Sequence, residues 1–291
     1  MCALAEELTP APLWGLSTRL GLTDCILNLN GQQNARRGSP HFLPDTQEAA
    51  HLSVALFHFG PLPPPHPSHP EEKTPSFPSD EGWPFAKYLG ACGRMVAVNY
   101  VGEELWSFYN APWEKRVDLA RQLMDIAEQL TNNDFDFALY LLDVSFDNFA
   151  VGPRDGKVII VDAENVLVAD KRQIKQDKPE NYDVWYESRF EECDREACLS
   201  FSKEALCSRV TVDHNYYAVC HNLLSQYATW RGTTGGLLHD PPAHIAKDGQ
   251  LEALLDECTK PKKRYGRFQA AKELREYLTR LSAASSSAMA R

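Results

Sequence analysis

The sequence has no apolar run that approaches the ~18–20 residues a membrane-spanning helix needs. It has no basic excess either: 30 Lys and Arg stand against 40 Asp and Glu, and the formal net charge is -10. Because nucleic-acid binding depends on clustered cations that neutralise phosphates, this balance argues against a general nucleic-acid binder. The eight cysteines include no Cys-x-x-Cys pair, which leaves a zinc site without support. We therefore expect neither a transmembrane segment nor a nucleic-acid partner.

The cysteines are nevertheless concentrated in one part of the chain. Four fall within 28 residues: Cys193, Cys198, Cys207 and Cys220. Such a cluster favours disulfides formed in an oxidising lumen, with reduced cysteines packing as small apolar side chains as the alternative. The sequence alone does not assign their connectivity.

The composition and residue pattern divide the chain into three regions. Residues 1–80 show no sustained periodicity, and the run PLPPPHPSHP excludes a helix or a central strand. We interpret residues 1–80 as a disordered Pro-rich segment, with a polyproline ligand as the alternative. Residues 81–282 are expected to form one folded domain, and residues 283–291 a flexible tail.

The folded domain is predicted to combine strands with helices. Branched and apolar residues predict strands over 85–89, 95–100, 138–142, 149–152, 158–161 and 166–168. Apolar residues at three- and four-residue intervals predict a long helix over 114–132, and shorter helical patterns cover 213–220, 251–258 and 268–281. The expected fold class is therefore α+β.

Carboxylate and amide side chains follow the strands of the central stretch. Asp143 and Asp162 each come directly after an apolar run, and Asn148 follows Asp143 by five positions. Phosphoryl transfer needs one carboxylate to take the hydroxyl proton, and an amide with a second carboxylate to hold Mg²⁺ against the phosphates. The spacing suits that chemistry. Asp and Asn also occur in such turns merely because they bond nearby backbone, which is the structural alternative.

The order of these elements closely resembles the divergent protein kinase domain family from Trp83 to Leu281. The segments LLDVSFDNFAVGPRDGKVIIVDAENVLVAD, EACLSFSKE and PKKRYGRFQAAKELREYL carry the resemblance. It implies a protein-kinase-like fold, here mostly the helical C-lobe with the last N-lobe strands and the hinge. Most of the N-lobe would be missing.

The resemblance also implies roles for individual residues. Asp143 would be the catalytic base, while Asn148 and Asp162 would be ligands of Mg or Mn bound with ATP. Tyr100 and Val101 would be the hinge positions that hold adenine.

Two further roles implied by the resemblance are structural. Asp213 would cap the helix over 213–220 and brace the catalytic-loop backbone. Arg264 would be the arginine that pairs with the activation segment.

The sequence departs from the pattern of active kinases at several positions. Leu141-Leu142 stand in place of His-Arg, Ser145 in place of a lysine that often holds the γ-phosphate, and Ala163-Glu164 in place of Phe-Gly. No Gly-x-Gly-x-x-Gly, Val-Ala-x-Lys or Walker loop is found. Losing one preorganised electrostatic group typically costs about 10²–10³ in rate, so we expect little or no phosphoryl transfer. An atypical kinase dependent on Mg-ATP is the alternative.

The resemblance further implies a cysteine-rich signalling protein of the Golgi and secretory vesicles, or one that is secreted. Its partner would be a receptor or a vesicle-trafficking protein, and the sequence leaves the oligomeric state open. Glu6 and Glu7 stand where a signal peptide carries positive charge, so no signal peptide is expected in this chain. A cytoplasmic location is therefore the alternative.

Overall fold

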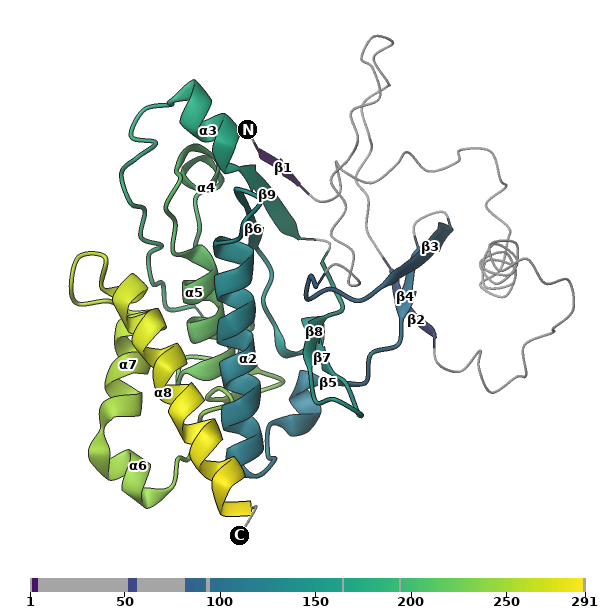
Figure 1. Ribbon diagram of the computed structural model, residues 1–291, viewed down its shortest axis with the longest axis vertical. Coiled ribbons are helices and arrows are strands. Elements are labelled where there is room, and N and C mark those ends of the chain that lie inside the picture. The colour runs from purple at the N-terminus through teal and green to yellow at the C-terminus, as the bar shows by residue number, and fades with distance from the viewer. Residues whose placement is uncertain are drawn as a thin grey trace, which may run out of the picture.

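The structure is a computed structural model that describes residues 2–4, 52–56, 82–92, 95–163, 165–193 and 195–289 (Figure 1). The strands are β1 (Cys2–Leu4), β2 (Leu52–Leu56), β3 (Tyr88–Cys92), β4 (Met95–Asn99), β5 (Glu103–Glu104), β6 (Phe137–Leu141), β7 (Phe149–Val151), β8 (Val158–Ile160), β9 (Val166–Asp170), β10 (Thr229–Trp230) and β11 (Thr233–Thr234). The α-helices are α2 (Trp113–Thr131), α3 (Lys171–Asp177), α4 (Lys203–Ser208), α5 (His214–Val219), α6 (Ala243–Asp248), α7 (Gln250–Thr259) and α8 (Gly266–Met289). Short 3-10 turns lie at η4 (Leu105–Phe108) and η5 (Phe146–Asn148), and a π turn follows α5 at η6 (Cys220–Leu224).

This mixture of helices and small sheets confirms the predicted α+β class. The strand predicted over 85–89 lies instead at Tyr88–Cys92, and α8 continues to Met289, past its predicted end at residue 281. Of the Pro-rich segment, only two short stretches belong to the described residues. They form strands, β1 pairing with β9 and β2 pairing with β4. The PLPPPHPSHP run lies outside the described residues.

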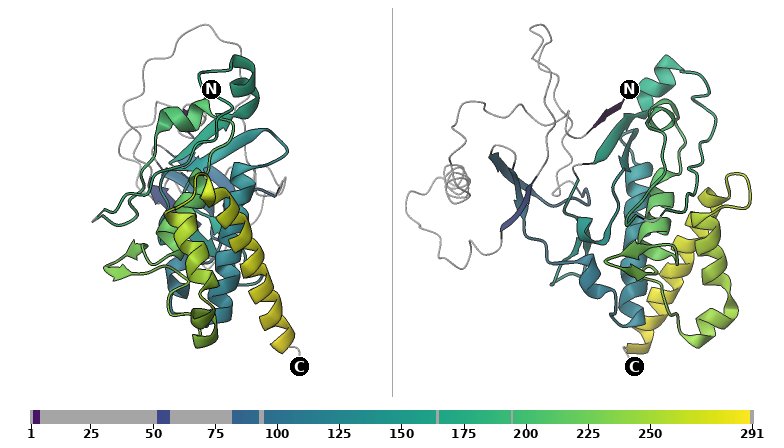
Figure 2. Two further views of the ribbon diagram at one scale, coloured as in Figure 1. Left: turned by 90° about the vertical axis from the view of Figure 1, so that its left-hand side faces the viewer. Right: turned by 180° about the vertical axis from the view of Figure 1, so that it is seen from behind.

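The helices pack around α2. Pro112 precedes this helix, Glu114 lies in its first turn where the helix dipole favours a negative charge, and one face carries fully buried Leu123, Ala127 and Leu130. This face packs against α8 and α5 (Figure 1). The β5–β7–β8 sheet lies between the helices and the β2–β4–β3 sheet (Figure 2). In the described part of the chain, no helix combines the length and the apolar composition needed to cross a membrane.

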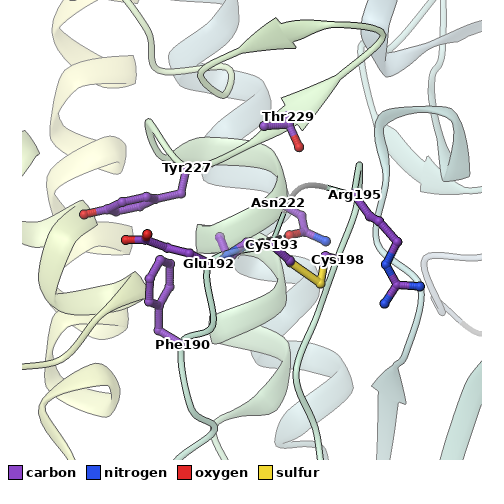
Figure 3. Close-up of a pocket in the computed structure, with 9 residues that line it drawn as sticks. Phe190, Glu192, Cys193, Arg195, Cys198, Asn222, Tyr227 and Thr229 are labelled. Carbon is purple, nitrogen blue, oxygen red and sulfur yellow. Dashed lines mark hydrogen bonds between the residues drawn. A yellow bond between two sulfur atoms is a disulfide. The ribbon is translucent and has the colours of Figure 1, made fainter.

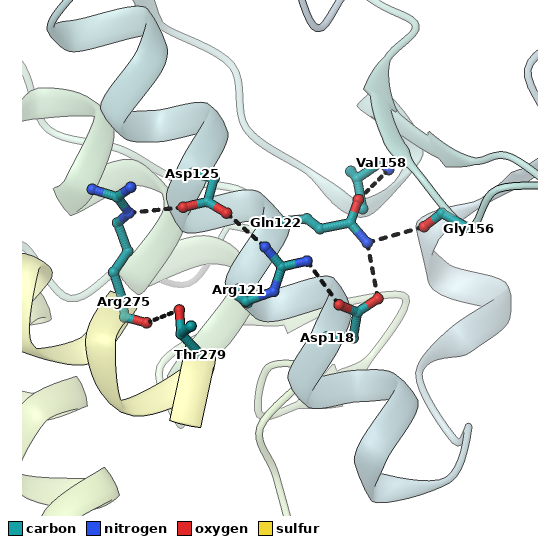
Figure 4. Close-up of polar contacts among 8 residues, drawn as sticks. All are labelled: Asp118, Arg121, Gln122, Asp125, Gly156, Val158, Arg275 and Thr279. Atoms are coloured by element: carbon teal, nitrogen blue, oxygen red, sulfur yellow. Dashed lines mark hydrogen bonds and ion pairs between the residues drawn. The ribbon is translucent and has the colours of Figure 1, made fainter. Parts of the chain in front are cut away.

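Polar contacts tie α2 to the β7–β8 hairpin and to α8 (Figure 4). The Gln122 side chain accepts a hydrogen bond from Val158 N at 2.9 Å and donates one to Gly156 O at 3.0 Å. Arg275 of α8 pairs with Asp125 of α2 at 2.8 Å. Half-exposed ion pairs add little stability. The Gln122 amide therefore fixes the hairpin against α2, whereas the ion pair contributes little to the contact between α2 and α8.

Two disulfides lie within the described residues, and they confirm the expectation that the clustered cysteines form disulfides. Cys193 pairs with Cys198, and Cys220 pairs with Cys258. Cys207 is also disulfide-bonded. The Cys220–Cys258 bond is completely buried and joins η6 to α7.

A buried ion pair connects α5 to α8, and it corrects two sequence-based expectations. Asp213 does not cap α5 with its side chain; Oδ1 accepts from Ser188 N at 2.7 Å and Oδ2 pairs with Arg267 at 2.5 Å. Both side chains of the pair have no exposed surface. Arg264, by contrast, is exposed and donates to Tyr265 OH. The structural arginine is therefore Arg267, because only this position faces the buried carboxylate.

Arg267→Met should destabilise the protein by about 3–5 kcal/mol, because the substitution leaves the Asp213 carboxylate buried without its cation. Arg264→Met, three residues away and exposed, is the matched control and should change stability by less than about 0.5 kcal/mol. Denaturant unfolding of both variants measures the difference. Equal effects of the two substitutions would contradict the assignment.

Candidate functional site

The loop that carries Asp143 follows β6 and is held by hydrogen bonds on both sides of that residue. The Leu141 backbone N donates to Asn215 Oδ1 at 3.0 Å, and the Leu141 carbonyl lies 2.7 Å from His214 Nε2. The Leu142 N donates to Asn165 O at 2.8 Å. Because these groups lie immediately before Asp143, they set the point at which its side chain leaves the strand.

Asn222 fixes the loop on the other side of Asp143. Its Nδ2 donates to Val144 O at 2.8 Å, and both residues are buried. Asn215 extends the same support to the helical body, since its Nδ2 also donates to Thr131 Oγ1 at the end of α2. The brace that the resemblance assigned to Asp213 is thus supplied by neighbouring residues of the same segment.

Sequence reasoning did not identify these bracing residues. His214, Asn215 and Asn222 belong to no recognised motif in the sequence. The available signal was weak: polar side chains lie among Tyr, Ala, Val and Leu in a helical pattern. Which backbone groups they bind depends on β6, more than 70 residues earlier in the chain.

Asp143, Asn148 and Asp162 are brought together. Asn148 Nδ2 donates to the Asp143 carbonyl at 3.2 Å, and the Asn148 carbonyl accepts from Val161 N at 2.9 Å and from Asp162 N at 3.4 Å. Burial raises the pKa of Asp143, and the negative charges of Asp147 and Asp162 raise it further, while a hydrogen bond from Asn148 opposes the shift. The site is therefore a cluster of carboxylates whose charges repel one another.

Two of these side chains offer oxygen ligands that suit a divalent cation. Mg²⁺ prefers carboxylate and carbonyl oxygens. Because Asn148 Nδ2 is engaged with Asp143 O, its Oδ1 is the amide atom that an ion beside Asp162 would meet. Across the residues that the structure describes, no group of three or more His, Cys, Asp or Glu side chains is arranged to hold a metal ion. Glu164 lies outside the described residues. Ligands beyond Asn148 and Asp162 would have to come from water or from a nucleotide.

The loop itself contains no cation. Residues 143–148 read DVSFDN, with neither Lys nor Arg. The hydroxyl of Ser145, at the position where active kinases often carry a lysine, donates to Asp147 Oδ1 at 2.5 Å. This hydroxyl is therefore directed toward a carboxylate.

The predicted hinge residues connect two sheets. Tyr100 and Val101 lie between β4 and β5, and the Tyr100 side chain is exposed. At Gly102, a Cβ atom would lie 2.0 Å from Val151 O, so only glycine allows this close approach to β7. The hinge segment is thus positioned against the hairpin that follows Asn148.

A separate pocket of about 90 Å³ lies beside the Cys193–Cys198 disulfide (Figure 3). Small-molecule pockets usually measure ~300–1,000 Å³, so this one is too small for a nucleotide. Asn222 lines it and donates to Val144 O, so the pocket lies behind the Asp143 loop and is not part of the carboxylate cluster.

The bracing histidine makes stability depend on pH. Complete burial lowers the pKa of His214 from 6.5 to about 4. The unfolded chain therefore binds this proton at a higher pH than the folded protein, and stability should fall as the pH drops from about 6.5 to 4. At about 1.36 kcal/mol per unit, the loss reaches roughly 3 kcal/mol.

His214→Gln should remove this part of the acid sensitivity while retaining an amide donor for Leu141 O. The measurement is the free energy of unfolding of wild type and variant at several pH values. His244→Gln, at an exposed histidine, is the control and should retain the wild-type slope. An unchanged slope in His214→Gln would contradict the interpretation.

Comparison with known proteins identifies the family of the chain. A family profile described as "Protein-kinase domain of FAM69" matches residues 74–261. Divergent protein kinase domain 2A of human, mouse and Xenopus tropicalis is in each case 87% identical over 207 residues, which is 71% of this chain and 48% of the relative. Human divergent protein kinase domain 2B is 33% identical over 154 residues, covering 51% of this chain and 33% of that protein. The chain spans about half the length of the 2A relatives. Since the profile covers more than half of the chain, this protein belongs to the divergent protein kinase domain family, as the resemblance predicted.

Proposed function

We propose that this chain is a kinase-like signalling module of the secretory pathway, or a secreted one, and that it does not itself transfer phosphate. The observation that carries the proposal is the electrostatics of the Asp143 loop. Residues 143–148 contain no cation, and Ser145 donates its hydroxyl to Asp147.

A nucleotide brings several negative charges to a site, and kinases offset them with a lysine, a phosphate-covering loop and metal ions. In this chain the ionisable groups that shift the pKa of Asp143 are the carboxylates of Asp147 and Asp162. Such a cluster repels phosphate unless a divalent cation lies between them. A cation at Asn148 and Asp162 would leave the γ-phosphate without a lysine from this loop.

The assignment of lobes is part of the proposal. We infer that α2, α5, α7 and α8 belong to the C-lobe, and that β3 and β4 are the last strands of the N-lobe. Two features support this: Tyr100 and Val101 lead from β4 into β5, and the hairpin after Asn148 follows the order found in kinases. Tyr100 and Val101 would then be the hinge that contacts adenine.

An atypical kinase that uses ATP with Mg or Mn is the second candidate. The convergence of Asp143, Asn148 and Asp162 favours it, because these are the base and metal-ligand positions of the resemblance. Asp143, with its raised pKa, would accept the hydroxyl proton of the substrate. The chain matches only about half the length of the 2A relatives, so the activity of a whole protein can differ from that of the chain.

The compartment is inferred from the disulfides. Such bonds persist in oxidising environments, such as the secretory lumen and the outside of cells. The Cys220–Cys258 bond joins residues 38 apart in the sequence, and because it is buried in the core it is a structural disulfide. We therefore place the protein in the Golgi and secretory vesicles or outside the cell, with a receptor or a vesicle-trafficking protein as its partner. The cytoplasm remains the alternative location.

Incubation of the chain with labelled ATP and Mg²⁺ or Mn²⁺ should give no label transfer above that of Asp143→Asn, because the loop supplies no cation for the γ-phosphate. Metal alone should raise the melting temperature of the wild type, and Asp162→Asn should abolish that shift, since a ligand selective for the native state stabilises it. Metal-dependent transfer that is lost in Asp143→Asn would establish the atypical kinase instead. A metal shift that survives Asp162→Asn would contradict the proposed ligand.

Protein recovered from a secretory host should contain no free thiol at Cys193, Cys198, Cys220 or Cys258. The paired substitution Cys220→Ala and Cys258→Ala should destabilise it by roughly 2–5 kcal/mol. The pair Cys193→Ala and Cys198→Ala is the matched control and should cost less, because it opens a much shorter loop. Thiol counting and denaturant unfolding test both statements; free thiols at all four positions would contradict the lumenal assignment.

A further inference from the structure

We propose that the turn between α7 and α8 is a docking surface for a sulfated glycan, a polysaccharide that carries many sulfate groups. The turn comprises residues 260–265, KPKKRY, and is called the basic turn below. The choice of ligand rests on the proposed export of the protein. The surface itself rests on three features: a fixed backbone, unpaired cations and an exposed aromatic platform.

The backbone of the basic turn is held by the carboxylate of Glu257. Glu257 Oε2 accepts from Lys262 N at 3.0 Å, and Oε1 accepts from Lys263 N at 3.0 Å. A Cβ at Gly266 would lie 2.0 Å from Glu257 Oε1, so glycine here lets that carboxylate reach the turn. This one carboxylate bonds two successive backbone amides and so restrains the turn at Lys262 and Lys263.

The cationic side chains of the basic turn face solvent. Lys262, Lys263 and Arg264 are exposed, and none of them forms an ion pair within the described residues. Lys260 is half-exposed and lies 3.8 Å from Glu192. These cations are gathered on a chain whose net charge is -10, and their side chains face solvent while Glu257 contacts the turn backbone.

An aromatic platform borders these cations. Trp185 is 47% exposed, and its ring centroid lies 5.6 Å from that of Tyr265 and 4.8 Å from that of Phe268. The Arg264 guanidinium lies over the Tyr265 ring at 4.8 Å. Tyr265 and Phe268 are partly buried, so the exposed ring of this group is that of Trp185, which can pack against the apolar face of a sugar ring. The basic turn thus pairs cations for sulfates with a platform for the sugar.

The charge of the chain and its disulfides select the ligand. Short basic runs are typical of nucleic-acid or heparin-binding patches. The net charge of -10 disfavours extended nucleic-acid contact, and the anionic lipids that attract polybasic segments face the cytoplasm. The polyanions met by a disulfide-bonded protein outside the cytoplasm are sulfated glycans. The turn also projects from the helical body on the side away from the β2–β4–β3 sheet, where a long polymer has access (Figures 1 and 2).

The experiment uses the whole oxidised chain and heparin as the probe, immobilised and eluted with salt. The wild type should be retained at about 0.15 M salt. The triple variant Lys262→Gln, Lys263→Gln and Arg264→Gln should bind on the order of 100-fold more weakly, because each cation near a polyanion contributes about fivefold. Trp185→Ala should weaken binding several-fold with a smaller change in salt dependence.

A matched control separates the site from overall charge. The triple variant Arg172→Gln, Lys175→Gln and Lys178→Gln removes the same charge from exposed positions of α3 and its end. It should bind heparin within about twofold of the wild type, since long-range effects are screened at this salt concentration. Circular dichroism checks that every variant is folded.

Failure of the wild type to bind heparin, or equal losses in the two triple variants, would overturn the proposal. Equally tight binding to phosphatidylserine vesicles or to polyglutamate would overturn the choice of a sulfated glycan. The assay contains no nucleotide, so it is independent of the phosphate-transfer test. A chain that transfers phosphate and binds heparin through the basic turn would refute the proposed function and leave this inference standing.

Discussion

The position of the Asp143 loop depends on buried polar side chains between residues 213 and 222. A buried polar group without a partner costs about 1–3 kcal/mol, so each such group must find one. Here the partners come from distant segments: Asp213 pairs with Arg267, His214 and Asn215 bind Leu141, and Asn222 binds Val144. These bonds make α5 and η6 the link between the carboxylate loop and the closing helices α7 and α8.

The Asp143 loop needs these supporting bonds because its carboxylates repel one another. The charges of Asp147 and Asp162 raise the pKa of Asp143, which means that the folded state holds these carboxylates against their repulsion. A carboxyl whose pKa is raised in the folded protein makes folding less favourable as the pH rises through that pKa, so the cluster lowers stability at neutral pH. Such an arrangement is typical of sites kept for function, and here it suits the binding of a cation better than the binding of bare phosphate.

The domain presents charge of opposite sign at two places joined by one buried ion pair. Asp213 stands before α5, which supports the acidic loop, and Arg267 stands at the start of α8, directly after the basic turn. The proposed glycan surface includes the exposed Trp185 ring, whereas the acidic loop has Ser145 bonded to Asp147. The two places therefore differ in charge and in neighbouring side chains, and so the ligands proposed for them differ in chemistry.

The sequence alone was sufficient for the family, the α+β class and most of the elements. The strand predicted over 138–142 lies at 137–141, and the helix predicted over 114–132 lies at 113–131. The grouping of Asp143, Asn148 and Asp162 was also predictable, because their spacing across one hairpin is a local property. Their catalytic and metal-binding roles stay predictions.

Only the tertiary structure decided which distant groups pair. The buried ion pair is made by Arg267 and not by Arg264, and Cys220 pairs with Cys258. The backbone of the Asp143 loop is bonded by His214, Asn215 and Asn222 and not by Asp213. Periodicity shows which face of a helix is apolar, but it does not show which backbone amide, 70 or more residues away, will face a buried side chain. That choice is made when the elements pack, because each buried polar group must be satisfied by whatever packing brings within hydrogen-bonding distance.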